Sequence, residues 1–260
     1  MNYIQISLPD LGIALILILI TLLLAYWERV GLGKSIIIGT IRAFIQLMAV
    51  GYILKFIFDL SRWYWVLLML AVMITVAGFD AVRRQEKKVP HNFAIVIISI
   101  TIGALLTLAT VTGLILRVQP WYQPQYVIPI AGMIIGNSMN GASLAINRLV
   151  AEIRLRRLEI EAALSLGATA RQAVNRSFKD AVKSAMIPTI NAMMIVGIVQ
   201  LPGMMTGQII AGTRPEHAVR YQVVVVYMLT SAVTITCLCA GLLTYRQYFT
   251  KSHQLKNELL

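Results

Sequence analysis

FAIVIISITIGALLTLATVTGLIL, residues 93–116, decides the fold class of this chain, because the stretch contains no charged residue. A helix that crosses a bilayer needs about 20 mostly apolar residues, and this stretch supplies them. Of all 260 residues, 58% are hydrophobic and 13% are charged, and the mean hydropathy is +0.75. A water-soluble domain of this length could not bury so much apolar surface. We therefore expect an all-α, polytopic integral membrane protein whose solvent is the lipid bilayer.

Six other segments come near the same requirement, the shortest being residues 63–79, which predicts about seven transmembrane helices. The predicted spans are residues 8–27, 36–58, 63–79, 93–116, 126–146, 187–211 and 222–245. The fifth and sixth spans contain several prolines and glycines, so we expect them to be bent or interrupted. In the sixth, the predicted helix break lies at Pro202, Gly203 and Gly207.

The cationic residues predict the orientation of these spans, since Lys and Arg near span ends stay on the cytoplasmic side. With the N-terminus outside, 17 of the 23 lysines and arginines fall on the inner side and four on the outer side. We therefore expect a multi-pass protein of the bacterial cytoplasmic (inner) membrane with its C-terminus in the cytoplasm. The net charge of +12 lies between apolar runs and not on one face of a soluble fold, so no nucleic-acid partner is expected.

Only one predicted inner loop, residues 147–186, is long enough to fold, and its sequence predicts a helix, a glycine turn and a second helix. The first helix extends the fifth span, and the spacing predicts two ion pairs: Glu152 with Arg156, and Arg157 with Glu161. The second helix begins at Thr169, whose spacing to Gln172 suits a capping box. It carries an apolar stripe and several basic residues, so the alternative is an amphipathic helix lying on the membrane surface.

The turn of this loop is EAALSLG, which resembles the motif by which many ABC permeases dock on their ATPase. The resemblance implies that the ATPase-coupling residues are Glu161, Ala162, Ala163, Leu164, Ser165, Leu166 and Gly167. A short helix joined rigidly to two spans suits this task, because a flexible loop would absorb the motion.

Four ordered segments extend the resemblance over nearly the whole chain: RAFIQLMAVGYIL (42–54), IPIAGMIIGNSMN (128–140), LSLGAT (164–169) and LPGMMTGQIIAG (201–212). Together they resemble the FetB family of ABC permeases, which are associated with iron export and metal resistance. The resemblance implies one permease domain, residues 1–260, that exports iron or another metal species as a homodimer with a separate ATPase.

The chain itself is expected to be neither an enzyme nor a cofactor-binding protein. Gly33, Lys34 and Ser35 imitate the end of a Walker A loop, but Glu28 stands where its first glycine is required. ATP and Mg²⁺ are therefore expected on the partner ATPase. No metal site is predicted, because the two cysteines have no partner ligands at suitable spacing. A passive membrane channel or receptor is the alternative from another class.

Polar side chains within the predicted spans are few, and each is costly unless it faces a cavity or a partner. The candidate substrate-pathway residues are Arg42, Gln46, Asn137, Ser138, Asn140, Asn191 and Gln200. The alternative is helix packing, in which Gly132 with Gly136 and Gly203 with Gly207 form GxxxG contacts.

Arg42 leaves two interpretations open. Its long side chain can snorkel to cytoplasmic phosphates or pair with Asp80 or Glu28 near the same boundary. Alternatively, it contacts the negative charge of an anionic iron complex, or of an acidic or phosphorylated organic solute carried by an ABC permease.

Overall fold

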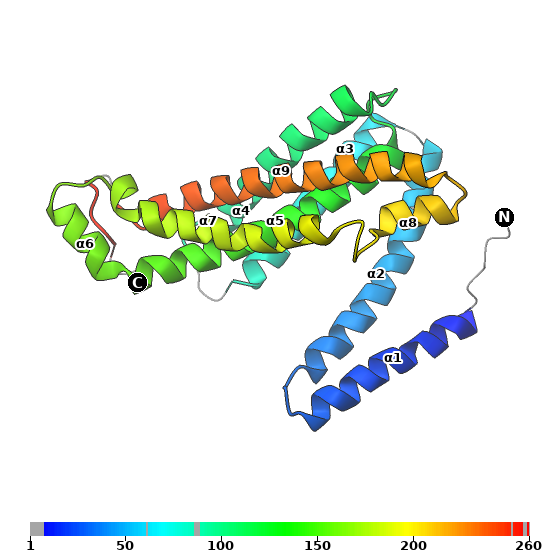
Figure 1. The fold of residues 1–260 in the computed structure, drawn as a ribbon, viewed down its shortest axis with the longest axis horizontal. Coiled ribbons are helices and arrows are strands. Elements are labelled where there is room, and N and C mark those ends of the chain that lie inside the picture. The colour runs from blue at the N-terminus through cyan, green and yellow to red at the C-terminus, as the bar shows by residue number, and fades with distance from the viewer. Residues whose placement is uncertain (1–7, 61, 86–88, 251, 257–258, 260) are drawn as a thin grey trace. The chain divides into compact units, whose positions relative to one another are not determined.

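The computed structural model describes residues 8–60, 62–85, 89–250, 252–256 and 259 (Figure 1). Three of the cationic residues assigned to the inner side, Lys87, Lys88 and Lys251, lie outside these described residues. The described residues form helices joined by short connections, with two isolated β-bridges and no strand. In chain order the elements are α1 (Leu8–Trp27), α2 (Gly33–Leu60), α3 (Trp63–Arg83), α4 (Asn92–Ala109), the π-helix η1 (Thr110–Ile115), α5 (Pro124–Leu155), α6 (Arg157–Ser165), α7 (Ala170–Ile195), α8 (Gly203–Ile210) and α9 (Pro215–Gln247).

The chain divides into two compact units. The first comprises Met1–Ser61 with Ile210–Gly212, and in it α1 and α2 contact each other. The second comprises Arg62–Ile209 with Thr213–Leu260. In this second unit α5 contacts α3, α4, α7 and α9, and Figure 1 shows α5, α7 and α9 running side by side. The core of the second unit is therefore built around α5.

The all-α, multi-pass membrane architecture is confirmed, whereas the count of seven spans is not. Six of the described helices are long and apolar enough to cross a membrane. The sixth predicted span, 187–211, is not one helix, because α7 ends at Ile195 and α8 begins at Gly203. The predicted interruption of this span is therefore confirmed. The fifth span is not interrupted, since α5 runs unbroken through Pro129.

The predicted inner loop 147–186 has the expected extension of the fifth span, glycine turn and second helix. Its first part is the end of α5, which continues to Leu155, and its last part belongs to α7, which begins at Ala170. Only α6 and a short turn remain between them. The apolar stripe of α7 faces protein, because Val174, Phe178 and Ala185 are buried. The alternative of a helix lying by this stripe on the membrane surface is therefore wrong.

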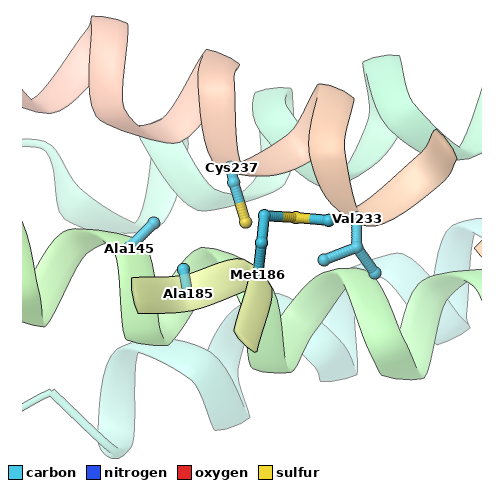
Figure 2. Packing of buried hydrophobic residues seen from close by; sticks show 5 residues of the cluster. All are labelled: Ala145, Ala185, Met186, Val233 and Cys237. Atoms are coloured by element: carbon cyan, nitrogen blue, oxygen red, sulfur yellow. The ribbon is translucent and has the colours of Figure 1, made fainter. Parts of the chain in front are cut away.

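Small side chains allow α5, α7 and α9 to approach closely. Figure 2 shows Ala145 of α5, Ala185 and Met186 of α7, and Val233 and Cys237 of α9 meeting in one buried cluster. Large side chains at these positions would hold the three helices apart.

The glycines that permit close approach are not those of the predicted GxxxG pairs. A β-carbon on Gly141 would lie 2.7 Å from Val233 Cγ1, and one on Gly103 would lie 2.2 Å from Thr236 Oγ1. In contrast, a β-carbon on Gly136, Gly203 or Gly207 would meet no described atom within 4 Å, and one on Gly132 would meet only Met73 Cε, at 3.3 Å. The close contacts within this chain therefore lie at glycines outside the predicted pairs.

Candidate functional site

A cavity of about 260 Å³ lies in the second unit between α5, α7 and α9. Its sides are mainly apolar, with Leu144, Met193 and Val226 among the lining residues. Six amide or hydroxyl side chains also line it: Asn137 and Asn140 of α5, Thr189 of α7, Gln200, and Gln222 and Thr230 of α9. None of its lining side chains carries a formal charge. The cavity therefore offers hydrogen bonds within a half-open, mainly apolar lining.

The interruption between α7 and α8 forms one side of this cavity. Gly197 has a φ of +86°, a left-handed conformation that favours glycine. The Gly197 amide donates to the Gln200 carbonyl at 2.9 Å, and the Val199 amide donates to the Ile195 carbonyl at 3.0 Å. These bonds satisfy backbone groups that the broken helix leaves open. They also place Gln200 and Pro202 on the cavity lining.

The position of the break corrects the prediction made from proline and glycine. Pro202 is the last residue of the break, Gly203 is the first residue of α8, and Gly207 lies inside α8. The break begins at Val196, whose backbone is extended. The residue whose conformation requires glycine is Gly197, which a proline-centred search passes over.

The polar groups on α5 are partly oriented by contacts inside the protein. The Asn137 side-chain amide donates to the Met133 carbonyl at 2.8 Å. Asn140 Oδ1 accepts a hydrogen bond from Arg84 Nη1 at 3.1 Å, and Arg84 Nη2 pairs with Asp80 Oδ2 at 3.0 Å. Because its oxygen is held by Arg84, Asn140 presents its NH₂ group as the donor that remains.

Gln222 contributes to this cavity a buried acceptor that has no partner among the described residues. Its side chain lies at 7% exposure, and Oε1 has no hydrogen-bond partner among the described residues. An acceptor buried without a donor costs about 1–3 kcal/mol. A donor supplied by a solute or by water would recover this energy, so Gln222 is a candidate recognition residue.

The predicted pathway residues separate into three groups in the structure. Asn137, Asn140 and Gln200 line the cavity. Ser138 is buried away from it, and Asn191 is exposed on α7 outside the lining. Arg42 and Gln46 lie on α2 in the first unit. A role in a pathway stays a prediction for all of them.

Three lining residues were not found from the sequence: Thr189, Gln222 and Thr230. Gln222 is the first residue of the predicted seventh span, where a polar side chain is unremarkable. The available signal was helical spacing, because Gln222, Val226, Leu229 and Thr230 share one face of α9.

The elbow between α5 and α7, which comprises α6 and the turn 166–169, is fixed by ion pairs. The two predicted pairs are confirmed, with Arg156 Nε at 3.1 Å from Glu152 Oε2 and Arg157 Nε at 2.8 Å from Glu161 Oε1. Arg156 Nη2 also lies 2.8 Å from Asp180 Oδ2 on α7. One guanidinium thus connects α7 with the end of α5.

The turn of the elbow follows the predicted glycine and capping chemistry. Gly167 has a φ of +88°, and the Ala168 amide donates to the Ala163 carbonyl at 3.1 Å, which closes the end of α6. The capping box of Thr169 and Gln172 at the start of α7 is confirmed. Ile160 is buried, whereas Leu166 is 89% exposed. The predicted coupling residues, from Glu161 to Gly167, therefore form a rigid projection with an exposed apolar tip.

The model of the uncharacterised protein family UPF0014 matches residues 8–249, which extend through both compact units. The chain belongs to the UPF0014 family. This UPF0014 protein is 39% identical over 255 residues to the probable iron export permease protein FetB of Escherichia coli, covering 98% of this chain and 97% of that protein. The resemblance to the FetB family is therefore confirmed.

Two other relatives support the same membership. The UPF0014 membrane protein YjkA of Bacillus subtilis is 40% identical over 256 residues, which cover 98% of this chain and 99% of that protein. Protein ALUMINUM SENSITIVE 3 of Arabidopsis thaliana is 34% identical over 246 residues, which cover 95% and 89%. No solved structure matches this UPF0014 chain.

Proposed function

We propose that this protein is the membrane-spanning permease subunit of an ATP-driven ABC exporter, and that it carries iron or another metal species. Two copies would associate with copies of a separate ATPase, which binds ATP and Mg²⁺, so this chain would perform no catalysis itself. The similarity to a relative named as a probable iron export permease supports the choice of cargo.

The observation that carries this proposal is the connection between the elbow and the cavity. Helices α5 and α7 both line the cavity, and α6 with its turn connects the last residue of α5 to the first residue of α7. A displacement of α6 therefore moves two of the three cavity walls, because the ion pairs of Arg156 hold the helix ends together. The interruption after Ile195 gives the far end of α7 a place to bend.

In this proposal α6 and the C-terminus face the cytoplasm and the N-terminus faces outward. Single cysteines at Trp121, in the α4–α5 connection, and at Ser252 test this orientation in a chain whose Cys237 and Cys239 are replaced by alanine. We expect an impermeant reagent to label the two positions from opposite sides. Labelling of both from one side would contradict the orientation.

The decisive experiment is reconstitution of the permease with its ATPase in liposomes. We expect ATP hydrolysis to rise with added iron, and iron to cross the bilayer only when ATP is hydrolysed. Gly167→Pro should abolish this stimulation while insertion remains normal, because proline cannot adopt the φ of +88° found at this position. Iron movement without ATP would indicate a passive channel instead.

A further inference from the structure

The residues that follow α9 fold back as a short hairpin against the elbow. This tail hairpin consists of residues 248–250 and 252–256 among those described. The Thr250 amide donates to the Gln254 carbonyl and the Lys256 amide donates to the Tyr248 carbonyl, both at 2.8 Å. Tyr248 and Phe249 are buried, at 1% and 6% exposure. The hairpin is therefore anchored to the helical core.

Direct bonds connect this hairpin and the following residues to both sides of the elbow. His253 Nδ1 accepts a hydrogen bond from the Ala170 amide at 3.3 Å. Ala170 is the first residue of α7, where a backbone N–H has no acceptor within its own helix. On the other side, Arg154 Nη2 of α5 donates to the Leu259 carbonyl at 3.1 Å. The end of the chain thus joins α5 and α7 a second time.

An open groove runs between the elbow and the tail hairpin. On the elbow side it is lined by residues that include Glu161, Ser165 and Gly167, and on the tail side by Ser252 and Gln254. Two large apolar side chains of the elbow are exposed, Leu158 at 79% and Leu166 at 89%. The groove and these leucines together have the features of a surface that receives a partner.

We propose that α6, its turn and the tail hairpin form one composite docking surface for the ATPase subunit, and that an ATPase side chain enters the groove. This inference rests on the proposed function. It adds the C-terminal tail to the coupling machinery, so that the ATPase contacts two segments that are about 90 residues apart in the chain.

The chemistry of the surface favours a protein over a lipid bilayer as its occupant. Helix α6 carries Glu159 and Glu161 against a single Arg157, so anionic headgroups would be repelled from it. A concave groove with polar walls also suits a protruding side chain better than a flat layer of headgroups. Further along α7, the exposed Lys179 and Lys183 make no ion pair among the described residues. The partner should therefore offer an apolar slot for the leucines of the elbow, and carboxylates only where it faces Lys179 and Lys183 of α7.

The tail allows a displacement of the docking surface to reach more helices than α6 alone would. If only α6 were contacted, force would pass through the short connections at its two ends. Contact with the hairpin passes force directly to Ala170, and through the buried Tyr248 to the end of α9. Leu259, which follows the hairpin, accepts the bond from Arg154 of α5. All three helices that line the cavity would then receive the displacement.

Photo-crosslinking in cells tests the inference on the full chain. p-Benzoylphenylalanine is placed at Leu166, at Ser252 or, as a control at the other end of α5, at the exposed Trp121. We expect positions 166 and 252 to crosslink to one polypeptide that binds ATP, and position 121 not to do so. Crosslinking of position 166 alone to this ATPase would overturn the role of the tail and leave the proposed function intact. Lipid adducts, or no adduct, at both positions would overturn the docking surface as a whole.

A matched pair of substitutions provides the second measurement. Ser252→Trp fills the groove, whereas Lys256→Trp places the same side chain on the same hairpin outside the groove lining. We expect Ser252→Trp to reduce co-purification of the ATPase at least tenfold with an unchanged melting temperature, and Lys256→Trp to retain it. Equal retention in both variants would refute the inference. If no ATPase co-purifies with the unaltered permease, the proposed function itself fails.

Discussion

Replacing Arg156 should lower the stability of the folded protein, because its guanidinium forms two ion pairs in the elbow. This side chain is 18% exposed and pairs with Glu152, which is only 3% exposed, and with Asp180, which is 41% exposed. Arg156→Met removes both pairs while keeping most of the aliphatic volume. The buried carboxylate dominates the effect, since the more exposed contact with Asp180 contributes under about 1 kcal/mol.

The size of the stability loss depends on the ion pair with Arg148 that Glu152 keeps in the Arg156→Met variant. Removing one partner of a buried ion pair costs roughly 3–5 kcal/mol when the remaining charge is uncompensated. Here Arg148 Nη2 remains 2.7 Å from Glu152 Oε1, and the Arg156 Nε contact is an ion pair without hydrogen-bond alignment. Because the charge of Glu152 stays partly compensated, we expect a loss of about 2 kcal/mol, below that range. For a chain of this size the melting temperature should fall by about 4–8 °C.

Thermal unfolding of the purified protein measures the effect, with Arg157→Met as the matched control. Arg157 and Glu161 are 43% and 37% exposed, so breaking their pair should cost well under about 1 kcal/mol. Adding Glu152→Gln to Arg156→Met removes the buried charge and should recover more than half of the lost stability. Equal losses in Arg156→Met and Arg157→Met, or no recovery in the double variant, would refute the reasoning.

Three further substitutions test packing, the cavity and the cargo. Gly103→Ala should cost about 1–3 kcal/mol of stability, seen as a lower melting temperature, because its β-carbon would lie 2.2 Å from Thr236 Oγ1. The control Gly136→Ala, which has open space around it, should show no loss. Gln222→Met should raise the melting temperature of the solute-free protein, since it removes an unpaired buried acceptor. It should also raise the half-saturating solute concentration about tenfold. A fall in stability would show that water satisfies this oxygen. Arg42→Lys distinguishes the two roles of that residue in liposome transport: a tenfold rise in half-saturation, about 1.4 kcal/mol, is expected if its guanidinium binds an anionic solute, and an unchanged value if it only snorkels.

Much of the elbow was predictable because its chemistry is local. The pairs of Glu152 with Arg156 and Arg157 with Glu161 are set by the 3.6-residue repeat, and the capping box at Thr169 is set by a spacing of three residues. In contrast, the contact of Arg156 with Asp180 joins residues on two helices. Nothing in the local pattern indicates which carboxylate on α7 faces that guanidinium.

The candidate cavity was only partly predictable. Asn137, Asn140 and Gln200 were selected because a polar side chain inside a span is costly, and all three line the cavity. The same criterion selected Ser138, which is buried elsewhere, and overlooked Gln222. The energetic cost of a polar side chain within a span identifies residues that need an explanation. It does not indicate toward which neighbouring helix each side chain points.

The sequence by itself determined that this protein is an all-α, multi-pass membrane protein of the UPF0014 family, because apolar length and composition are properties of single segments. Only the tertiary structure decided which glycines bring helices together, where α7 breaks, and that the C-terminal tail lies against the start of α7. These features depend on the rotation and register of helices about their axes, which are set by packing between segments distant in the chain. The contact of His253 with Ala170 illustrates the difference, since it joins residues 83 positions apart through a single hydrogen bond.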